Sequence, residues 1–399
     1  MKEVLLTNRC FQKSILTLFF LYVLCGSICA QEFKSVHDGV EYAELTRTID
    51  GQPVRMNFLR LDLTKVRLDV VHAGETVIGT ETVSAIATRH RAVAAINAGF
   101  FRLDTSAFAG DPAGIFQIDR RLLSEANQGR IALLIDNGVL ACVKCKNLQT
   151  KTSVAIAHLK TFGELWSETH RSNIAGIDRQ VKDNEIVLFT PEFGPATSKS
   201  ETPVTEAVIE NKRIVSVTET TGGTVIPRNG YVLTASGSRR SELMANAIKG
   251  KEGLIILGSY IENPENSTTN AKMAFTSVED IVGGVPQLIK NGKIDITWEQ
   301  EKASKSFFET RHPRTAVAKL KDGKFLMITV DGRSESSGGI SLNDLASVLL
   351  ELGAVDAMNL DGGGSTTMFL DGKVVNKPSD KEGERKVSDA LLVTLRKKK

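Results

Sequence analysis

The residues best suited to chemistry form a glycine-rich run near the C-terminus. The run reads Asn359, Leu360, Asp361, Gly362, Gly363, Gly364, Ser365 and Thr366. Glycine is entropically expensive to order, so three in succession indicate that the backbone approaches another group closely. Exposed N–H groups on such a loop can cradle an anion, and Asp361 ends an apolar segment beside it. A tight crossover between two strands, with Asp361 as a turn former, explains the run equally well.

Two further segments place arginine beside apolar, strand-like stretches. Arg311 and Arg314 precede such a stretch that begins at Thr315, and Arg333 follows Asp331 at the end of the next one. A planar guanidinium suits bidentate binding of phosphate or carboxylate. An arginine next to Asp331 would also favour the ionised carboxylate. Surface charge at a strand start and a simple Asp-Gly turn are the structural alternatives.

A fourth segment has groups that sugar sites use. Asn97 ends a predicted strand and is followed by Gly99 and two phenylalanines, of which Phe101 is the second. An amide can bind hydroxyl groups, and an aromatic ring can cover the apolar face of a sugar. Core packing is the alternative for at least one of the two rings.

The remaining patterns describe the elements that position these segments. Four Asn-Gly or Asp-Gly pairs lie between β-prone stretches and tolerate the positive φ of hairpin turns. They are Asn137-Gly138, Asn291-Gly292, Asp322-Gly323 and Asp371-Gly372. Helical spacing of leucines predicts a helix over 341–352, and a second helix is predicted over 82–90, before a strand at 92–96. The sequence therefore predicts an α+β fold, mainly antiparallel or mixed β-sheet with a few packed helices.

In their order and approximate spacing, these segments resemble the phosphodiester glycosidase family. The matching stretches are Asn97 to Phe101, Gly283-Gly284 with Asn291-Gly292, Arg311 to Ala316, Val330 to Arg333, the helix at 341–352, and Asn359 to Thr366. The resemblance spans most of residues 40 to 395. It implies one domain over 31–399, made of an N-terminal part (31–145), a less patterned insert (146–275) and a motif-rich C-terminal part (276–395).

The resemblance also implies an activity. The family's best-known member removes N-acetylglucosamine from a phosphodiester, so this chain is expected to hydrolyse a sugar–phosphate bond. Asp361 and Asp331 are the catalytic candidates, and the sequence does not say which plays which role. The substrate-binding candidates are Asn97, Gly99, Phe101, Gly284, Arg311, Arg314, Thr315, Arg333, Asn359, Gly362, Gly363, Gly364, Ser365 and Thr366. Arginines and loop amides would hold the departing phosphate charge.

Composition bounds the partners and the compartment. Residues 1–30 combine a basic start, an apolar run and small residues ending at Ala30, which predicts a cleaved signal peptide, a secreted or periplasmic protein and no membrane span after cleavage. A net charge of +3 is a poor footprint for nucleic acid, so the expected partner is a phosphorylated glycan or glycosyl phosphodiester. Cys142 and Cys145 fit a structural disulfide or plain thiols, and Asn266 begins a glycosylation sequon that matters only in a eukaryotic secretory pathway.

No cofactor is required by this reading. No cluster in the sequence has convincing metal-ligand spacing, so a divalent metal is permitted but not implied. Two other classes of protein stay open: a non-catalytic glycan-binding protein of the cell envelope, and an exported phosphatase or phosphodiesterase. A dinucleotide-binding loop is disfavoured, because the glycines are not spaced Gly-x-Gly-x-x-Gly and lead into a β-prone stretch. The sequence does not indicate an oligomeric state.

Overall fold

The computed structural model describes residues 32–127, 129–138, 151–167, 170–261 and 278–397. The predicted signal peptide, the cysteine pair at 142 and 145 and the sequon at 266 lie outside these residues. Within them, no helix has the length and apolar character needed to cross a membrane.

The molecule is predominantly β, which corrects the α+β class expected from the sequence. Strand accounts for 49% and helix for 11% of the structure. The helices found in the described chain are too short to form a layer comparable with the sheets, so they only cover parts of sheet faces. They are α2 (Val83–Arg89), α3 (Arg239–Asn246), α4 (Lys305–Glu309) and α5 (Leu342–Glu351), with the 3-10 turns η1 (Ala73–Glu75) and η2 (Gly363–Ser365).

An eight-stranded sheet carries three of the motif segments. Its strands, in spatial order, are β1 (Lys34–His37), β2 (Val40–Ile49), β3 (Gln52–Leu61), β22 (Phe325–Val330), β21 (Arg314–Leu320), β23 (Ala354–Asn359), β19 (Gln287–Lys290) and β20 (Lys293–Ile294). Alternate side chains face opposite sides, as a strand requires. Val317 enters the central core, whereas Ala316 and Ala318 pack in the cluster that contains the α5 residues Leu342 and Leu345.

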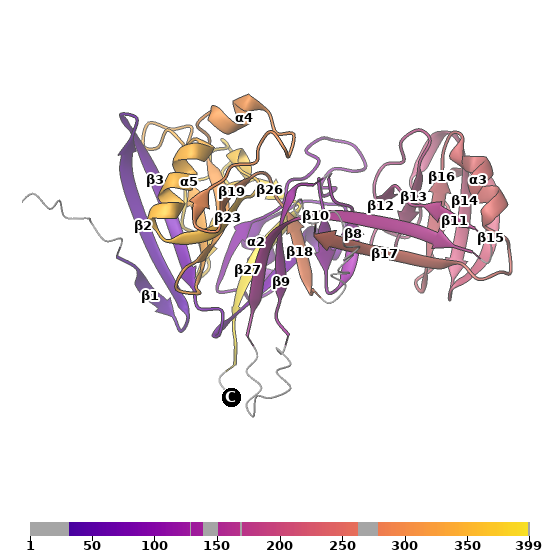
Figure 1. The fold of residues 1–399 in the computed structure, drawn as a ribbon, viewed down its shortest axis with the longest axis horizontal. Helices are drawn as coiled ribbons and strands as arrows, with labels where there is room; N and C mark the ends of the chain where they lie inside the picture. The colour runs from indigo at the N-terminus through magenta and orange to yellow at the C-terminus, as the bar shows by residue number, and fades with distance from the viewer. Residues whose placement is uncertain (1–31, 128, 139–150, 168–169, 262–277, 398–399) are drawn as a thin grey trace, which may run out of the picture.

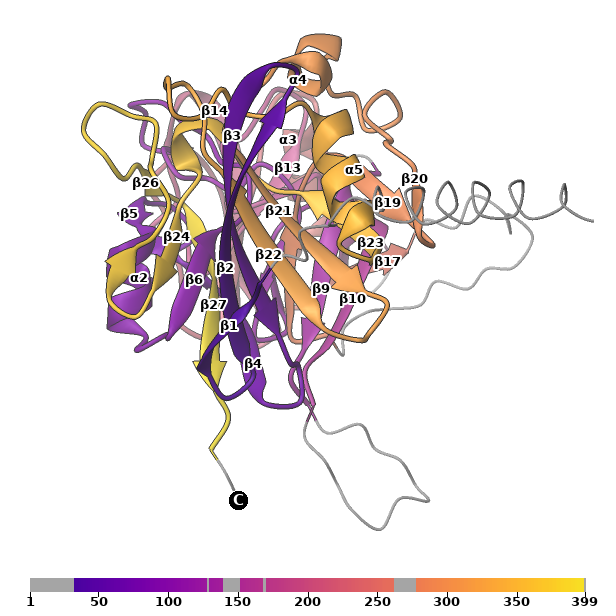
Figure 2. The same cartoon turned by 90° about the vertical axis from the view of Figure 1, so that its left-hand side faces the viewer.

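A five-stranded sheet forms the other wall of the central core. Its order is β25 (Lys373–Val374), β24 (Met368–Leu370), β6 (Ala94–Asn97), β27 (Asp389–Leu395) and β4 (Val66–His72), and β5 (Glu81–Thr82) pairs with β26 (Lys386–Val387) beside it. Figure 2 shows α5 and the group β24, β6 and β27 on either side of β21 and β22. The glycine-rich run crosses from β23 in the first sheet to β24 in the second.

A smaller lobe extends from this body on two long strands, β10 and β17 (Figure 1). These strands belong to a seven-stranded sheet of β11 (Arg171–Asn173), β10 (Ser153–Trp166), β9 (Ile131–Asp136), β18 (Asp280–Gly283), β7 (Phe116–Ile118) and β8 (Arg121–Ser124), with β17 (Leu254–Ile261) paired to β10. The lobe itself is a sheet of β12 (Gly176–Ile177), β13 (Ile186–Phe189), β16 (Gly230–Ala235), β14 (Lys199–Glu210) and β15 (Arg213–Gly222), in that order, with α3 against it. It falls within the segment 146–275, where the sequence is less patterned.

Local signals in the sequence position several elements as expected. Three of the four predicted turns join antiparallel pairs, namely β19 to β20, β21 to β22 and β24 to β25. The predicted helix over 341–352 is confirmed as α5, and the hydroxyl of Ser341 accepts a hydrogen bond from the Asp344 N–H at 3.1 Å. The predicted helix over 82–90 is confirmed as α2, where Thr82 accepts from the Ala85 N–H.

Candidate active site

The glycine loop is tied to two segments that are distant in sequence. The Asp361 N–H donates to the carbonyl of Ala98 at 3.0 Å, just after β6. The Gly363 N–H donates to the carbonyl of Pro313 at 2.9 Å, just before β21. Three of the four motif segments therefore meet at one end of the two sheets.

Close approach explains why three glycines occur in succession. A Cβ on Gly362 would lie 2.7 Å from the Pro313 carbonyl oxygen, which is too close for any side chain. Gly363 has a φ of +60°, in the left-handed region that favours glycine. A Cβ on Gly364 would lie 2.1 Å from Nη2 of Arg385. The loop is thus pressed against backbone on one side and a guanidinium on the other.

Two arginines flank this loop. Nη2 of Arg333 would lie 3.0 Å from a Cβ on Gly363, and Arg333 itself has a φ of 59° that turns the chain back towards the loop. Arg385 makes a bidentate ion pair with Asp380, at 2.7 and 3.1 Å. Burial and the charges of Arg314 and Arg333 lower the pKa of His312 nearby. Arg333 therefore places a positive charge beside the loop, whereas the charge of Arg385 is paired with that of Asp380.

Asp361 is the carboxylate at the centre of this environment. One of its oxygens accepts from the Gly362 N–H at 2.9 Å. Burial is the largest influence and raises its pKa to about 6, against the opposing effects of the Ser365 hydroxyl, the Gly362 N–H and the charge of Arg385. A carboxyl with such a pKa changes its protonation state close to neutral pH.

A second aspartate near Asp361 was not among the residues predicted from the sequence. Asp389 begins β27, is 1% exposed, and accepts from the Gly99 N–H and the Ser388 hydroxyl, both at 2.5 Å. Burial raises its pKa, and its negative charge raises the pKa of Asp361 in turn. A single aspartate that opens an apolar strand is too common a pattern to indicate this position. Arg385 was missed for the same reason, because it lies in an ordinary charged loop.

Asp331 lies at the end of β22 and is linked to the loop by one side chain. Its Oδ1 accepts from the Lys377 N–H at 3.0 Å and from the Asn376 amide at 3.2 Å. The same amide nitrogen donates to the carbonyl of Thr366 at 3.0 Å. Burial raises the pKa of Asp331, and Arg55, 3.9 Å away, lowers it.

Arg314 and Arg311 have their side chains turned to other parts of the fold. The guanidinium of Arg314 is 1% exposed and donates to the carbonyls of Phe307, Thr310 and Ile340, so it holds α4 in place. Arg311 donates to the carbonyls of Ile49 and Gly339. Burial lowers the pKa of Arg314 to about 10. Strand alternation explains the orientation of Arg314, because Thr315 faces the central core and the residue before it must face the opposite side of the sheet.

The amides of Asn97 and Asn359, both predicted to bind substrate, are engaged within the fold. Asn97 accepts from the Thr315 hydroxyl at 2.8 Å and from the Thr367 N–H at 3.1 Å, and donates to the Asp361 carbonyl at 2.7 Å. It therefore fastens the glycine loop to both sheets. Asn359 similarly donates to the carbonyls of Val285 and Leu360.

The other predicted positions are spread around this junction. A Cβ on Gly284 would lie 2.4 Å from the Asn359 carbonyl oxygen, so this glycine allows two backbones to touch. Phe101 bridges to Pro112 and packs against a satellite core. Gly99 donates to Asp389 and directly follows Ala98, whose carbonyl accepts from the Asp361 N–H. The hydroxyl of Thr366 is buried and finds no hydrogen-bond partner within the described chain.

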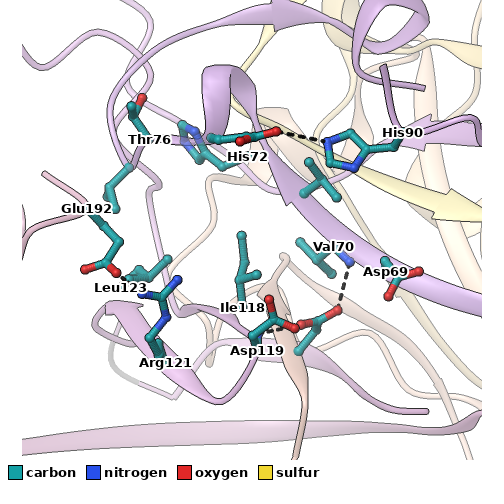
Figure 3. A pocket seen from close by; sticks show the side chains of 14 residues that line it. Asp69, Val70, His72, Thr76, His90, Ile118, Asp119, Arg121, Leu123 and Glu192 are labelled. Carbon is teal, nitrogen blue, oxygen red and sulfur yellow. Dashed lines mark hydrogen bonds and ion pairs between the residues drawn. The ribbon is translucent and has the colours of Figure 1, made fainter. Parts of the chain in front are cut away.

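A separate cavity of about 420 Å³ lies against β4. None of the residues predicted from the sequence lines it. Figure 3 shows Glu192 facing Arg121 on one side of the cavity. Asp119 lies beside the carboxylate of Asp280, which accepts from the Val70 and Asp119 N–H groups. Burial raises the pKa of Asp280 to about 7. Throughout the described ranges, no three His, Cys, Asp or Glu side chains are grouped so that they could hold a metal ion.

Comparison with known proteins supports the family predicted from the motifs. Residues 204–394 match the model of the phosphodiester glycosidase family. The N-acetylglucosamine-1-phosphodiester alpha-N-acetylglucosaminidase of Bos taurus is 30% identical over 200 residues, which are 43% of this chain and 36% of that protein. The chain thus matches little more than a third of its relative's length.

Two solved structures share the fold. A protein from Synechocystis has a TM-score of 0.74 at 22% identity, over 92% of this chain and 64% of that one. A Burkholderia pseudomallei K96243 protein, described as exported, has a TM-score of 0.69 at 24% identity, over 86% of this chain and 74% of that one.

The fold and the site define a predominantly β protein with an arginine-flanked glycine loop and a partly buried carboxylate. The resemblance to the phosphodiester glycosidase family is confirmed, and residues 204–394 carry the match. The name of this family denotes hydrolases that cut the glycosidic bond of a phosphodiester.

Proposed function

We propose that this protein is an exported glycosidase that hydrolyses a glycosyl phosphodiester, releasing a free sugar and a phosphomonoester. The observation that carries the proposal is the convergence of Asp361, Arg333 and Arg385 on one glycine loop. Export rests on the predicted signal peptide, and the structural relative described as exported agrees with it.

The leaving group explains why arginines rather than a strong acid serve this reaction. When the bond between the anomeric carbon and the phosphate oxygen breaks, the departing phosphate monoester takes the electron pair and is stable near neutral pH. The demand on the protein is to hold that negative charge as it develops. Arg333 and Arg385 supply charged donors beside the loop, and charged donors make the stronger hydrogen bonds. Arg385 also binds Asp380 through Nε and Nη2, so a phosphate would compete with Asp380 for these donors. Arg314 contributes to this site by holding α4, because its donors already bind carbonyl groups.

A carboxylate is needed on the sugar side of the bond. The anomeric carbon becomes positively charged as the phosphate leaves, and an ionised carboxylate can stabilise it or activate the attacking water. Asp361 is placed to do this beside the arginines, and its pKa of about 6 leaves it mostly ionised at pH 7. Asp331, held by Asn376 and Lys377, is the second candidate, and Asp389 positions the segment around Gly99.

The decisive experiment locates the bond that is cut. The purified protein is incubated with the methyl phosphodiester of α-N-acetylglucosamine 1-phosphate in H₂¹⁸O, and the products are analysed by mass spectrometry. The expected products are N-acetylglucosamine with ¹⁸O at the anomeric position and unlabelled methyl phosphate. Activity is expected to persist with a chelator, because arginines hold the leaving charge.

Controls separate the proposal from its alternatives. Label in the phosphate would indicate a phosphodiesterase instead, and binding without turnover would indicate a glycan-binding protein. Asp361→Asn should abolish release of the sugar. Asp280→Asn is the matched control, because it alters a buried carboxyl with a raised pKa in the cavity beside β4. Equal loss of activity in both variants, or in neither, would contradict the assignment of Asp361.

A further inference from the structure

The N-terminal hairpin brings polar side chains to the inner face of the eight-stranded sheet. Asn57 of β3 is directly opposite Thr329 of β22, so the two side chains project from the same face. Asp331 follows Thr329 by two residues and therefore projects on that face as well. Arg55 is the next residue of β3 on this face. Its backbone N–H donates to the Ser337 hydroxyl at 3.1 Å, and its Nε lies 3.9 Å from Oδ2 of Asp331, beyond hydrogen-bond distance.

Three atoms of this group retain hydrogen-bonding capacity. They are Nδ2 of Asn57, Oγ1 of Thr329 and Oδ2 of Asp331, and none has a hydrogen-bond partner in the part of the chain that the structure describes. The three residues are 0%, 0% and 2% exposed. Leaving such groups unpaired when buried is unfavourable, so their clustering points to a ligand that pairs them.

Tyr42 fixes which atom Asn57 offers. The Tyr42 hydroxyl donates to Oδ1 of Asn57 at 2.8 Å, which leaves the amide nitrogen as the free end. The group therefore presents a donor (Asn57), a hydroxyl that both donates and accepts (Thr329) and an acceptor (Asp331). A sugar hydroxyl, which donates one hydrogen bond and accepts others, matches this set. A phosphate does not, because a carboxylate would repel it.

We propose that Asn57, Thr329 and Asp331 form a subsite for a hydroxyl group of the substrate's sugar. This inference rests on the proposed function and adds the N-terminal strand β3 to the site, upstream of the residues that match the family model. The phosphate would lie at the arginines and the sugar beneath Asn376, whose amide joins Asp331 to the glycine loop through the Thr366 carbonyl. Tyr42 is then a positioning residue that acts through Asn57.

Thr329→Val tests the subsite with little change of shape. Valine replaces the hydroxyl by a methyl group and is well suited to a strand. The matched control is Thr205→Val in β14 of the smaller lobe, where the hydroxyl is likewise buried and without a partner among the described residues. Binding of α-N-acetylglucosamine 1-phosphate is measured by calorimetry for the wild type and both variants. We expect the Kd to rise about tenfold in Thr329→Val, the effect of about 1.4 kcal/mol from an unmade hydrogen bond, and to stay unchanged in Thr205→Val.

Tyr42→Phe provides a second variant that does not touch the ligand. It should weaken binding in the same direction but less, because the Asn57 amide can then rotate. Equal affinity in all four proteins would overturn the subsite, and this result is the one expected if the three atoms pair only with a buried water. Wild-type protein that binds neither this probe nor glucose 1-phosphate at millimolar concentration would overturn it too. Binding that depends on Thr329 without release of ¹⁸O-labelled sugar would refute the proposed hydrolysis and leave the subsite standing.

Discussion

Replacing Gly364 by alanine should separate activity from stability at the glycine loop. The new Cβ would lie 2.1 Å from Nη2 of Arg385 and 2.3 Å from Oδ1 of Asp380. Both atoms end flexible side chains that are 26% and 25% exposed, so the ion pair can move aside without disturbing the backbone. The free energy of unfolding should therefore fall by only about 1 kcal/mol, the upper end of what an ion pair at the protein surface usually contributes.

Activity should fall far more than stability, because the displaced guanidinium no longer faces the departing phosphate. Removal of one preorganised donor to a developing negative charge costs about 10²- to 10³-fold in kcat. We expect a loss of this size for Gly364→Ala in the release of N-acetylglucosamine from its methyl phosphodiester, with a smaller change in KM. Urea unfolding measures the change in stability on the same protein samples.

A double-mutant cycle identifies the cause. If the methyl group acts by displacing Arg385, then Gly364→Ala combined with Arg385→Met should be no slower than Arg385→Met alone. Gly372→Ala is the control for a glycine replaced in a loop, since its Cβ would meet nothing within 4 Å and only its φ of +81° is strained. Full activity of Gly364→Ala, or losses that add across the cycle, would refute the reasoning.

Three further outcomes follow from the same contacts. Burial raises the pKa of Asp361 to about 6, so kcat/KM should rise with pH through about 6. The charge of Arg385 lowers this pKa, so Arg385→Met should move the inflection to higher pH. A profile that is flat from pH 5 to 8 would contradict the role of Asp361. Burial raises the folded-state pKa of Asp178 to about 8, above its unfolded value of about 3.9. The folded protein therefore binds this proton more tightly, and the free energy of unfolding should decline as pH rises from about 4 to about 8. Urea unfolding of Asp178→Asn should show a shallower decline. Arg314→Met should lower the free energy of unfolding by about 3 kcal/mol or more, because three carbonyls lose a charged donor. Arg333→Met should change stability by less than about 1 kcal/mol and should reduce activity. If instead Arg314→Met mainly reduced activity and Arg333→Met mainly reduced stability, Arg314 would be the residue that meets phosphate.

Local patterns in the sequence predicted several elements and the resemblance to a family. The turn pairs at 291–292, 322–323 and 371–372 form hairpins because Asn, Asp and Gly tolerate the required φ whatever surrounds them. Ser341 begins α5 because its hydroxyl is within reach of an N–H three residues away. The order of the motifs indicated the phosphodiester glycosidase family. All of these depend on spacing along the chain, which the sequence contains in full.

The helical content of the fold was overestimated for a related reason. A helical pattern of 10 residues in α5 is prominent in a sequence, whereas strands such as β14 and β15 in the smaller lobe carry mixed patterns of buried and exposed residues. Strand identity there depends on partners that are distant in the chain, so single-sequence periodicity detects it poorly. The two predicted helices were found as α2 and α5, whereas α3 and α4 were not predicted, and the sheets proved larger than their local signals indicated.

Only the tertiary structure decided which side chains meet. Arg314 and Arg333 look equivalent in sequence, yet β21 turns Arg314 towards α4 while Arg333 lies against Gly363. Asp389 and Arg385 join the site because β27 pairs with β6 and brings the chain before it to the glycine loop. Which face a strand residue occupies is set by pairing register, and pairing is a contact between distant segments. The sequence by itself therefore predicted a reaction class through its resemblance to a family, and the packing of the sheets decided which of the candidate residues meet.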